Sequence, residues 1–378
     1  MTHRNVLIVG GGIGGLATAA AMRQAGFSVS VLEREHDMHS SVFGVGIIQP
    51  GNALRALDVI GCAQACIDEG YPAEAWGAMY DIEGNFIHDI HGTPIEGTDL
   101  PPMNGVTRPK LHRILTDRAR EAGAEIRYNA AFESLEQDEE GVNVRLADGT
   151  TERWDLVIGA DGVGSAVRRH VLDEVLAPEY IGQSAFRVNI PRLPQIDRII
   201  LQASPGGVAG VVPIGKDLAY LFYNAEMERD QRPSGDELRP ALMERLAPFG
   251  ALIGEIRDYH IPEDADIVLR PEEAMIAPAP WHRGRVVLMG DAVHAVPPHL
   301  GQGAAQAIED GVVLAECLLT HGEDHSAAFE EYTERRYERC KLIVETCVDI
   351  GKWERGLLPG FDNVAATSHA LEEMAKPL

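Results

Sequence analysis

The chain has 378 residues, of which 45% are hydrophobic and 24% charged, so it can form one large or two ordinary globular domains. Its net charge of -25 would repel a phosphate backbone or an anionic membrane surface, and nucleic-acid binding is therefore disfavoured. No uncharged apolar run reaches the roughly 18 residues that span a bilayer, and the first residues lack the pattern of a signal peptide. We expect no integral membrane contact and a cytoplasmic location.

The five cysteines are odd in number and show no paired spacing typical of a metal site. Cys62 and Cys66 lie one helical turn apart in an apolar segment, which indicates reduced packing residues rather than a redox pair. We expect neither a disulfide framework nor a bound metal.

The first 160 residues alternate between strand and helix patterns. Residues 5–9 and 28–33 are apolar strand patterns, and the Ala-rich stretch 13–25 between them predicts a helix. Further helices are expected at 52–60 and 110–122, the latter ending at Gly123. Strands are expected at 125–128, 142–146 and 155–159.

The pattern changes near residue 178 to alternating strand-like runs that continue to about 275, which predicts a mixed sheet inserted into the first domain. A parallel-strand pattern returns at 285–289, and the remaining chain is helical. We predict a discontinuous dinucleotide-binding domain (1–177 plus 276–350), a substrate domain (178–275) and a C-terminal helical tail (351–378).

The first motif is a glycine turn between the first strand and the first helix. Gly10, Gly12 and Gly15 fit the pattern G-x-G-x-x-G, which permits a tight turn and close approach of the backbone to a pyrophosphate. The helix N-terminus adds N–H donors and a positive dipole. Glu33 ends the second strand, where a carboxylate can accept hydrogen bonds from a ribose.

Two further motifs place an Asp directly after a buried strand, at the edge where open α/β sheets bind ligands. Asp161-Gly162 follows the strand at 155–159, with Ser165 and Arg168 in the next helix. Gly290-Asp291 follows the strand at 285–289 and precedes a Pro- and Gly-rich turn at 297–304. Both Asp residues could instead be simple helix N-caps.

These three motifs, in this order and spacing, resemble the group A flavoprotein monooxygenases, which include the aromatic-ring hydroxylases. The resemblance covers about residues 5–320 and implies an α/β fold, with a Rossmann-like FAD-binding domain of the glutathione-reductase type, an inserted mixed β-sheet and C-terminal helices. It also implies that Glu33 binds the adenosine ribose, with Arg34 beside it. Asp291 would bind the ribityl chain, and Asp161-Gly162 would structure a loop serving both FAD and the nicotinamide.

The resemblance extends to the residues around the flavin ring. Val106-Thr-Arg108 matches an arginine-led helix that would place Arg108 against the diphosphate or ribityl, although a surface ion pair is its alternative. Gly44, Gly46 and Ile47 fall where the family's glycine loop passes the flavin. The turn that would lie beside the isoalloxazine comprises Pro297, Pro298, Gly301, Gly303 and Ala304.

The implied reaction begins when NADH or NADPH reduces FAD. Oxygen then forms a C4a-hydroperoxyflavin, and one oxygen atom passes to a small aromatic or heteroaromatic substrate. Candidate substrate-binding residues are Ile47, Gln49, Arg187, Tyr220, Tyr223 and Pro297, and candidate catalytic residues are Tyr223, Pro297 and His299. Period-two alternation along 218–223 lets only one tyrosine line the pocket, and we prefer Tyr223. His294 is interpreted as a structural histidine beside Asp291.

Other chemistries remain open at this point. The same motifs would bind FAD for epoxidation, a Baeyer–Villiger-type oxidation or dehydrogenation. A non-catalytic flavin-binding module is a further alternative, although the inserted sheet argues against it. The short C-terminal tail points to the compact subgroup that acts on small aromatic acids, N-heteroaromatics or related secondary metabolites. The chain could be a monomer or a homodimer.

Overall fold

A six-stranded sheet forms the core of the part that carries the glycine turn. The computed structural model describes residues 4–37, 45–173, 175–204 and 207–378. The strand order of this sheet is β18 (His282–Arg283), β19 (Val286–Leu288), β12 (Leu156–Gly159), β1 (Asn5–Val9), β2 (Ser28–Leu32) and β8 (Glu125–Arg127). Neighbouring strands are parallel except β18 and β19. The central strands β19, β12, β1 and β2 consist mainly of apolar residues. Most of their side chains are buried on both faces of the sheet, as is typical of parallel sheets.

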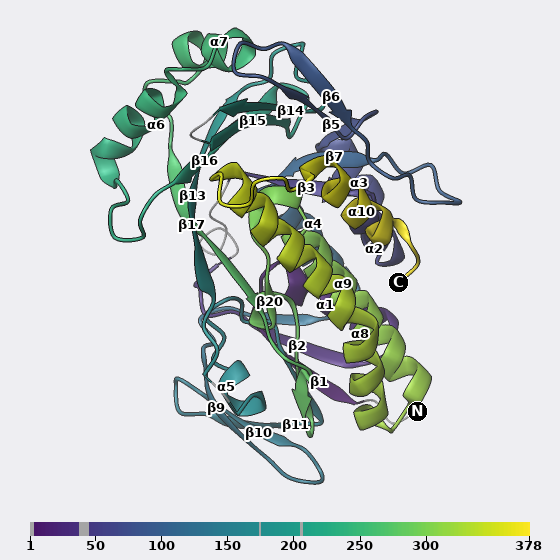
Figure 1. Ribbon diagram of the computed structural model, residues 1–378. Coiled ribbons are helices and arrows are strands. Elements are labelled where there is room, and N and C mark those ends of the chain that lie inside the picture. The colour runs from purple at the N-terminus through teal and green to yellow at the C-terminus, as the bar shows by residue number, and fades with distance from the viewer. Residues whose placement is uncertain (1–3, 38–44, 174, 205–206) are drawn as a thin grey trace.

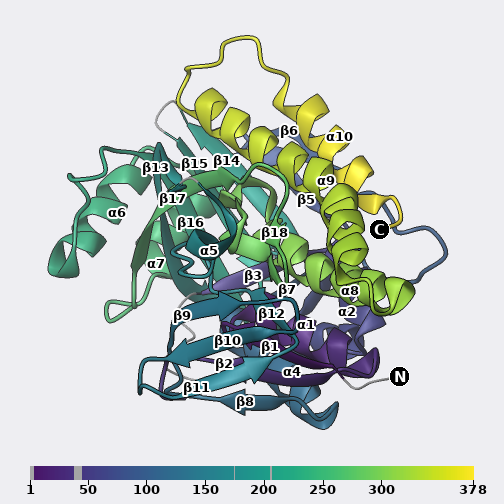
Figure 2. The ribbon, with the colours of Figure 1, turned by 90° about the horizontal axis from the view of Figure 1, so that it is seen from below.

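Smaller elements complete this part of the chain. An antiparallel sheet of β9 (Phe132–Gln137), β10 (Val142–Leu146) and β11 (Thr151–Trp154) lies in front of the main sheet in the view from below (Figure 2). A three-stranded sheet joins β3 (Gly46–Pro50), β7 (Met103–Thr107) and β4 (Tyr71–Ala73). The helices here are α1 (Ile13–Gln24), α2 (Gly51–Val59), α3 (Ala63–Glu69), α4 (Arg108–Glu121) and α5 (Arg168–Val171). The expected strand–helix–strand start is therefore present.

An eight-stranded sheet stands at the opposite end of the molecule (Figure 1). Its order is β20 (His294–Ala295), β17 (Val268–Ile276), β13 (Glu179–Pro191), β16 (Leu218–Glu226), β15 (Gly207–Pro213), β14 (Ile199–Ser204), β5 (Gly77–Tyr80) and β6 (Phe86–Ile90). Helices α6 (Leu238–Leu246) and α7 (Ala251–Tyr259) cover its outer face. The sheet extends beyond the predicted range 178–275, because β5 pairs with β14 across more than 100 residues and β20 pairs with β17.

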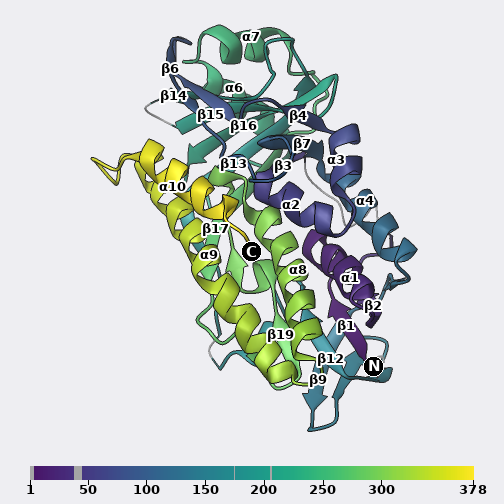
Figure 3. The ribbon, with the colours of Figure 1, turned by 90° about the vertical axis from the view of Figure 1, so that its right-hand side faces the viewer.

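Three C-terminal helices connect the two ends. Helix α8 (Gly303–His321) packs between α1 and α9 (His325–Glu354), and α9 runs along the molecule to the eight-stranded sheet (Figure 3). Helix α10 (Asn363–Ala375) lies within the predicted helical tail and packs on α9 and α2. Among the described residues, no helix combines the length and apolarity needed to cross a membrane.

A buried ionic network joins these helices to the 3-10 turn Gly290–Ala292, which carries Asp291. The Asp310 carboxylate accepts hydrogen bonds from the backbone N–H of Gly290 (2.8 Å) and from Arg336 Nε (2.7 Å), and it pairs with His294 Nε2 at 2.6 Å. Arg336 also donates to Glu309 Oε2 at 2.6 Å, and all four side chains are fully buried. His294 is therefore structural, as expected, but its partner is Asp310.

The same network decides whether a metal fits there. His294, Asp310 and Cys340 place ligand atoms within 4.8 Å of one another. The Arg336 guanidinium already binds Asp310 and lies 3.6 Å from Cys340 Sγ, so an added cation would have to displace a buried positive charge. The absence of a metal centre stays a prediction.

Protonation of Asp310 should weaken the network. Burial by itself would raise the pKa of Asp310, but His294 and Arg336 lower it from 3.8 to about 2. Because this pKa is depressed in the folded state, its contribution to stability is present above pH 4 and is lost as the pH falls through about 2.

We expect Arg336→Met to lower the free energy of unfolding by about 3–5 kcal/mol, because it leaves Glu309 and Asp310 buried without their cation. The matched control is Arg335→Met, which removes the neighbouring, more exposed pairs with Glu316 and Glu331 and should cost about 0–1 kcal/mol. Denaturant unfolding of both variants checks this, and equal losses would contradict it.

Candidate active site

The glycine turn brings β1, α1 and β12 into close contact. Gly10 has φ +114°, which disfavours other residues, and a β-carbon on Gly15 would lie 2.0 Å from the Gly10 carbonyl oxygen. A β-carbon on Gly12, in contrast, would have no neighbour within 4 Å. Gly10 and Gly15 are thus required by packing, whereas Gly12 leaves its backbone open to the cleft beside it.

Glu33 lies where the resemblance places the ribose-binding acid. Its side chain is buried, and its two carboxylate oxygens accept hydrogen bonds from the backbone N–H groups of Gly11 and Glu35, each at 2.9 Å. These bonds fix the carboxylate beside the glycine turn. The Arg34 side chain is 81% exposed, pairs with Glu35 at 3.5 Å and does not line the cleft.

A cleft of about 380 Å3 runs from the glycine turn to the start of α8, and we call it the cofactor cleft. This volume is within the range of ligand sites, about 300–1,000 Å3. Predicted cofactor residues that line it are Gly12, Gly46, Arg108, Gly162, Asp291, Pro298, Gly301, Gly303 and Ala304. Ile47 lines it too, whereas Gly44 lies outside the described residues.

Arg108 and Asp291 face the middle of the cofactor cleft from different elements. Arg108 is the first residue of α4, where Thr107 caps the helix by accepting from the Lys110 N–H. Desolvation raises the pKa of Asp291, and the charges of His294 and Arg108 partly oppose this rise. Arg108 therefore belongs to the cleft, which favours its cofactor role over a surface ion pair.

Asp161 acts on its own loop. Its carboxylate accepts from Ser165 Oγ (2.5 Å) and from the N–H groups of Ala166 (2.7 Å) and Val167 (3.1 Å). Arg168 then donates from Nη1 to the Ala292 carbonyl at 2.9 Å, so the second motif holds the third in place. Asp161 structures the loop, as expected, and its two neighbours, Ala160 and Gly162, line the cleft in its place.

The far end of the cofactor cleft is formed by the turn before α8. Gly301 has φ +63°, and Gly303 and Ala304 begin the helix, so the α8 N-terminus points its N–H groups at the cleft. Pro298 lines the cleft, whereas Pro297 is buried and lines neither this cleft nor the cavity described next. The short 3-10 turn at Pro298–Leu300 places the second proline at both cavities, and a substrate contact of Pro297 stays a prediction.

Together these groups fit FAD. The open backbone at Gly12 suits a pyrophosphate, Glu33 suits the ribose beside it, and Arg108 and Asp291 suit the middle of the molecule. The positive end of the α8 dipole suits a flavin ring that becomes anionic when reduced. The cleft would therefore hold the flavin ring at its α8 end.

A second cavity of about 60 Å3, here called the inner cavity, adjoins that end. It shares Ile48, Arg187, Tyr220 and Pro298 with the cofactor cleft. Its remaining lining is mainly apolar and comprises Trp76, Ile199, Leu201, Val208, Phe222, Asn224, His299 and Glu354. The shared residues mark the place where a substrate would meet the flavin.

The structure selects Tyr220, not Tyr223, for the inner cavity. The predicted alternation is present, but Tyr223 lies on the opposite face of β16, where its ring packs on Phe249 beneath α6 and α7. The preference for Tyr223 is wrong because the sequence pattern separates the two faces without saying which one meets the cofactor. Burial raises the pKa of Tyr220 to about 12, so its hydroxyl stays protonated at neutral pH.

Gln49 is also misplaced by the sequence interpretation. Its side chain is fully buried behind β3, where its Oε1 accepts from Asn104 Nδ2 at 2.6 Å. Ile48 lines both the cofactor cleft and the inner cavity, while Gln49 lines neither. Ile47 faces only the cofactor cleft.

His299 lines the inner cavity together with a carboxylate that the sequence did not indicate. Its Nε2 lies 3.4 Å from Glu354 Oε2 and 3.5 Å from Glu272 Oε2. Burial would lower the pKa of His299, but Glu354 and Glu272 raise it to about 8. Glu272 and Glu354 come from β17 and α9, and no sequence motif connects these segments to the Pro298–Leu300 turn.

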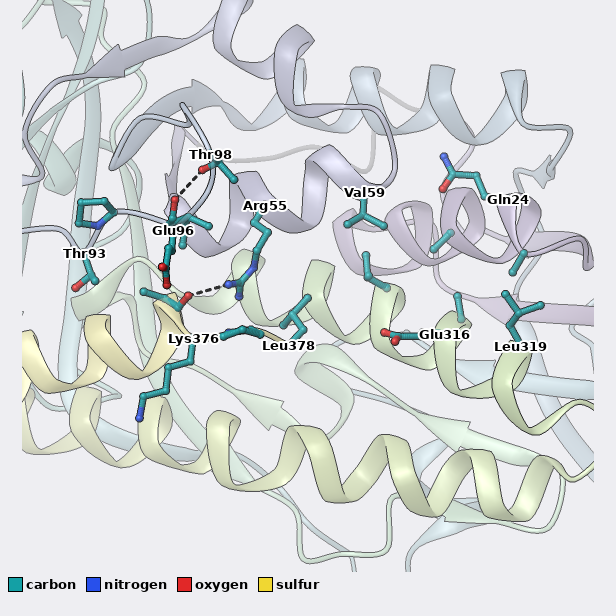
Figure 4. Close-up of a pocket in the computed structure, with 18 of the residues that line it drawn as sticks. Gln24, Arg55, Val59, Thr93, Glu96, Thr98, Glu316, Leu319, Lys376 and Leu378 are labelled. Atoms are coloured by element: carbon teal, nitrogen blue, oxygen red, sulfur yellow. Dashed lines mark hydrogen bonds between the residues drawn. The ribbon is translucent and has the colours of Figure 1, made fainter.

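A larger cavity, about 900 Å3, lies elsewhere (Figure 4). It is formed by α1, α2, α8 and the C-terminal residues, which Arg55 fastens by donating to the Ala375 carbonyl at 2.9 Å. None of the predicted site residues lines it. Size alone therefore does not identify the reactive site.

We expect Gly12→Ala to weaken FAD binding at least about tenfold, since the new methyl group would enter the cofactor cleft. The apoprotein should unfold at an unchanged denaturant midpoint, because no atom lies within 4 Å of the new group. Flavin titration and denaturant unfolding measure the two effects. Unchanged FAD affinity would contradict the assignment of the cleft.

We expect Tyr220→Phe to change the KM or kcat for an aromatic substrate, because Tyr220 borders both the cofactor cleft and the inner cavity. Tyr223→Phe is the matched control and should leave both constants within about twofold, as its ring lies in the core under α6 and α7. Steady-state kinetics decide. A larger effect from Tyr223→Phe would reverse the assignment.

Comparison with known proteins shows the family to which the chain belongs. The FAD binding domain family matches residues 3–347. The chain is 31% identical over 370 residues to the putative FAD-dependent monooxygenase YetM of Bacillus subtilis, covering 97% of this chain and 98% of that protein. It is 30% identical over 356 residues to 6-hydroxynicotinate 3-monooxygenase of Bordetella bronchiseptica, covering 89% of each.

The fold has a similar counterpart among solved structures. HpxO of Klebsiella pneumoniae, complexed with FAD and uric acid, superimposes with a TM-score of 0.84 over 99% of this chain and 93% of that chain. Its 23% identity supports the fold alone. The expected α/β class and FAD cofactor are confirmed. The chain belongs to the FAD binding domain family and, within it, to the FAD-dependent group A flavoprotein monooxygenases of the aromatic-ring hydroxylase type.

Proposed function

We propose that this enzyme uses NADH or NADPH and O2 to insert one oxygen atom into a small aromatic or N-heteroaromatic substrate held in the inner cavity. The observation that carries the proposal is the shared boundary between this cavity and the cofactor cleft at Ile48, Arg187, Tyr220 and Pro298. Relatives named for hydroxylating 6-hydroxynicotinate and 3-amino-4-hydroxybenzoate support the substrate class.

Different groups of the site would have different roles in the reaction. Bound FAD would supply the reduction of O2 that yields one transferable oxygen atom and one water. The apolar wall of the inner cavity, including Ile199, Leu201 and Val208, would exclude bulk water from the reacting atoms. Arg187, at the shared boundary, would stabilise negative charge that develops on the substrate ring.

The reductant, location and assembly follow from less specific features. We infer NADH or NADPH as the reductant because the group A flavoprotein monooxygenases, to which the chain belongs, take their electrons from a nicotinamide. A cytoplasmic location rests on the five free cysteines among the described residues. A monomer or a homodimer would both leave the two cavities intact.

The test is turnover under isotopically labelled O2 with a panel of phenols, hydroxybenzoates and hydroxylated N-heteroaromatics. We expect one substrate class to accelerate NAD(P)H oxidation and to gain one labelled oxygen atom per product molecule. Labelled oxygen in an epoxide or an ester would favour the alternative oxygenation chemistries. An oxidised product without labelled oxygen would establish dehydrogenation, and inactivity with every compound would favour a flavin-binding module.

A further inference from the structure

His299 has the surroundings of a buried base. Its side chain is 1% exposed and lies between Glu272 of β17 (2% exposed) and Glu354 of α9 (6% exposed). A β-carbon on Gly351 would lie 3.3 Å from His299 Cε1, so the close approach of α9 also depends on that glycine. Three separate elements thus converge on one imidazole ring.

The two ring nitrogens of His299 have different environments. Nε2 faces carboxylate oxygens of Glu354 at 3.4 Å and Glu272 at 3.5 Å, which favours the tautomer that carries its hydrogen on Nε2. Both ring nitrogens are buried and make no hydrogen bond to a residue that the structure describes, and the carboxylate contacts involve Nε2 alone. Because His299 lines the inner cavity, Nδ1 is the ring nitrogen left to accept a proton from a bound molecule.

The neighbouring charges stabilise the protonated ring. Glu354 and Glu272 favour the imidazolium, while Arg187 of β13 opposes it, and together they bring the pKa of His299 to about 8. The charge of Arg355 acts in turn to lower the pKa of Glu272. Burial raises the pKa of the nearby Cys347 thiol to about 12, so this thiol stays neutral. The ring can therefore hold a proton near neutral pH.

We propose that His299 is the general base that removes the proton from a hydroxyl group of the substrate, and that Glu272 and Glu354 are positioning residues for it. The substrate O–H bond breaks, an N–H bond forms at Nδ1, and the electron pair stays on the oxygen. No redox change accompanies this step. The oxyanion makes the ring more electron-rich and so more reactive toward oxygen transfer.

This inference rests on the proposed function and narrows its substrate class. His299 lines the inner cavity but not the cofactor cleft, so the ionisable hydroxyl would point away from the flavin. A carboxylate at that end would meet Glu354, which lines the same cavity, and would be repelled. The geometry favours hydroxylated aromatic or heteroaromatic compounds without a carboxylate beside that hydroxyl.

His299 also borders a further cavity. An outer cavity of about 80 Å3 shares His299, Glu354 and Trp76 with the inner cavity. Its other walls carry polar side chains that can bind water, namely His88, Asp89, His91, Asn363, Thr367 and Ser368. The imidazole therefore borders both the inner cavity and this outer cavity.

The first test measures the ionisation of bound 4-nitrophenol by difference absorbance, using oxidised holoenzyme without reductant so that no turnover occurs. We expect the pH midpoint of this ionisation to lie about one to three pH units below the midpoint of free 4-nitrophenol in water. His299→Asn should abolish this shift and Glu272→Gln should reduce it. The control His260→Asn, which removes an exposed His–Glu pair of the same 3.5 Å separation on α7, should retain it.

Flavin content of each variant separates a folding defect from a chemical one. If His299→Asn does not retain FAD, the isosteric Glu272→Gln and Glu354→Gln variants decide the question by the size of their shift. The assignment of His299 as the general base is overturned if the ionisation midpoint of bound 4-nitrophenol is unshifted in the wild-type protein. It is also overturned if all variants show the same shift. Neither result affects the proposed function, which fails only if no substrate elicits labelled product.

A second measurement compares kcat for phenols of decreasing hydroxyl pKa. We expect His299→Asn to lower kcat by on the order of 100-fold for weakly acidic phenols, with progressively smaller losses for acidic ones that ionise unaided. A merely structural role would give the same loss for every substrate, and that result would refute the assignment. In the wild type, kcat/KM for weakly acidic phenols should rise with pH through about 8, where His299 loses its proton.

Discussion

The carboxylate of Asp310 joins three segments on which the rest of the site depends. From α8 it accepts the Gly290 N–H, pairs with His294 and binds the Arg336 guanidinium of α9. All of these side chains are inaccessible to water, so loss of one charge leaves the others unpaired at a large energetic cost. The network thereby fixes the turn from which Asp291 enters the cofactor cleft.

That constraint propagates to both ends of the cleft. Arg168 donates a hydrogen bond to the Ala292 carbonyl, which links the Asp161 loop to the Asp291 turn. At the other end, Gln302 and Asn52 exchange hydrogen bonds of 3.1 Å, which secures the first turn of α8 against α2. A cofactor bound between these ends would meet groups already held in place, which lowers the ordering cost of binding.

The reactive end of the site combines groups from distant parts of the chain. Ile48 comes from β3, Arg187 from β13, Tyr220 from β16 and Pro298 from the turn before α8, yet all four border both cavities. Helix α9 adds Glu354 to the opposite wall. Since β5, β14 and β20 pair across long sequence separations, the pocket exists only once the eight-stranded sheet has assembled.

The sequence by itself determined the cofactor half of this protein, because a glycine turn, an acid after a strand and a helix N-terminus are local features. Gly12, Arg108 and Asp291 line the cofactor cleft, and Glu33 lies beside the glycine turn. Only the tertiary structure decided the substrate half. The period-two alternation of side chains along β16 puts Tyr220 and Tyr223 on opposite faces of the strand. It does not predict which of these faces helices α6 and α7 cover. Pairing of His299 with Glu272 and Glu354 likewise depends on long-range packing, which no local pattern encodes.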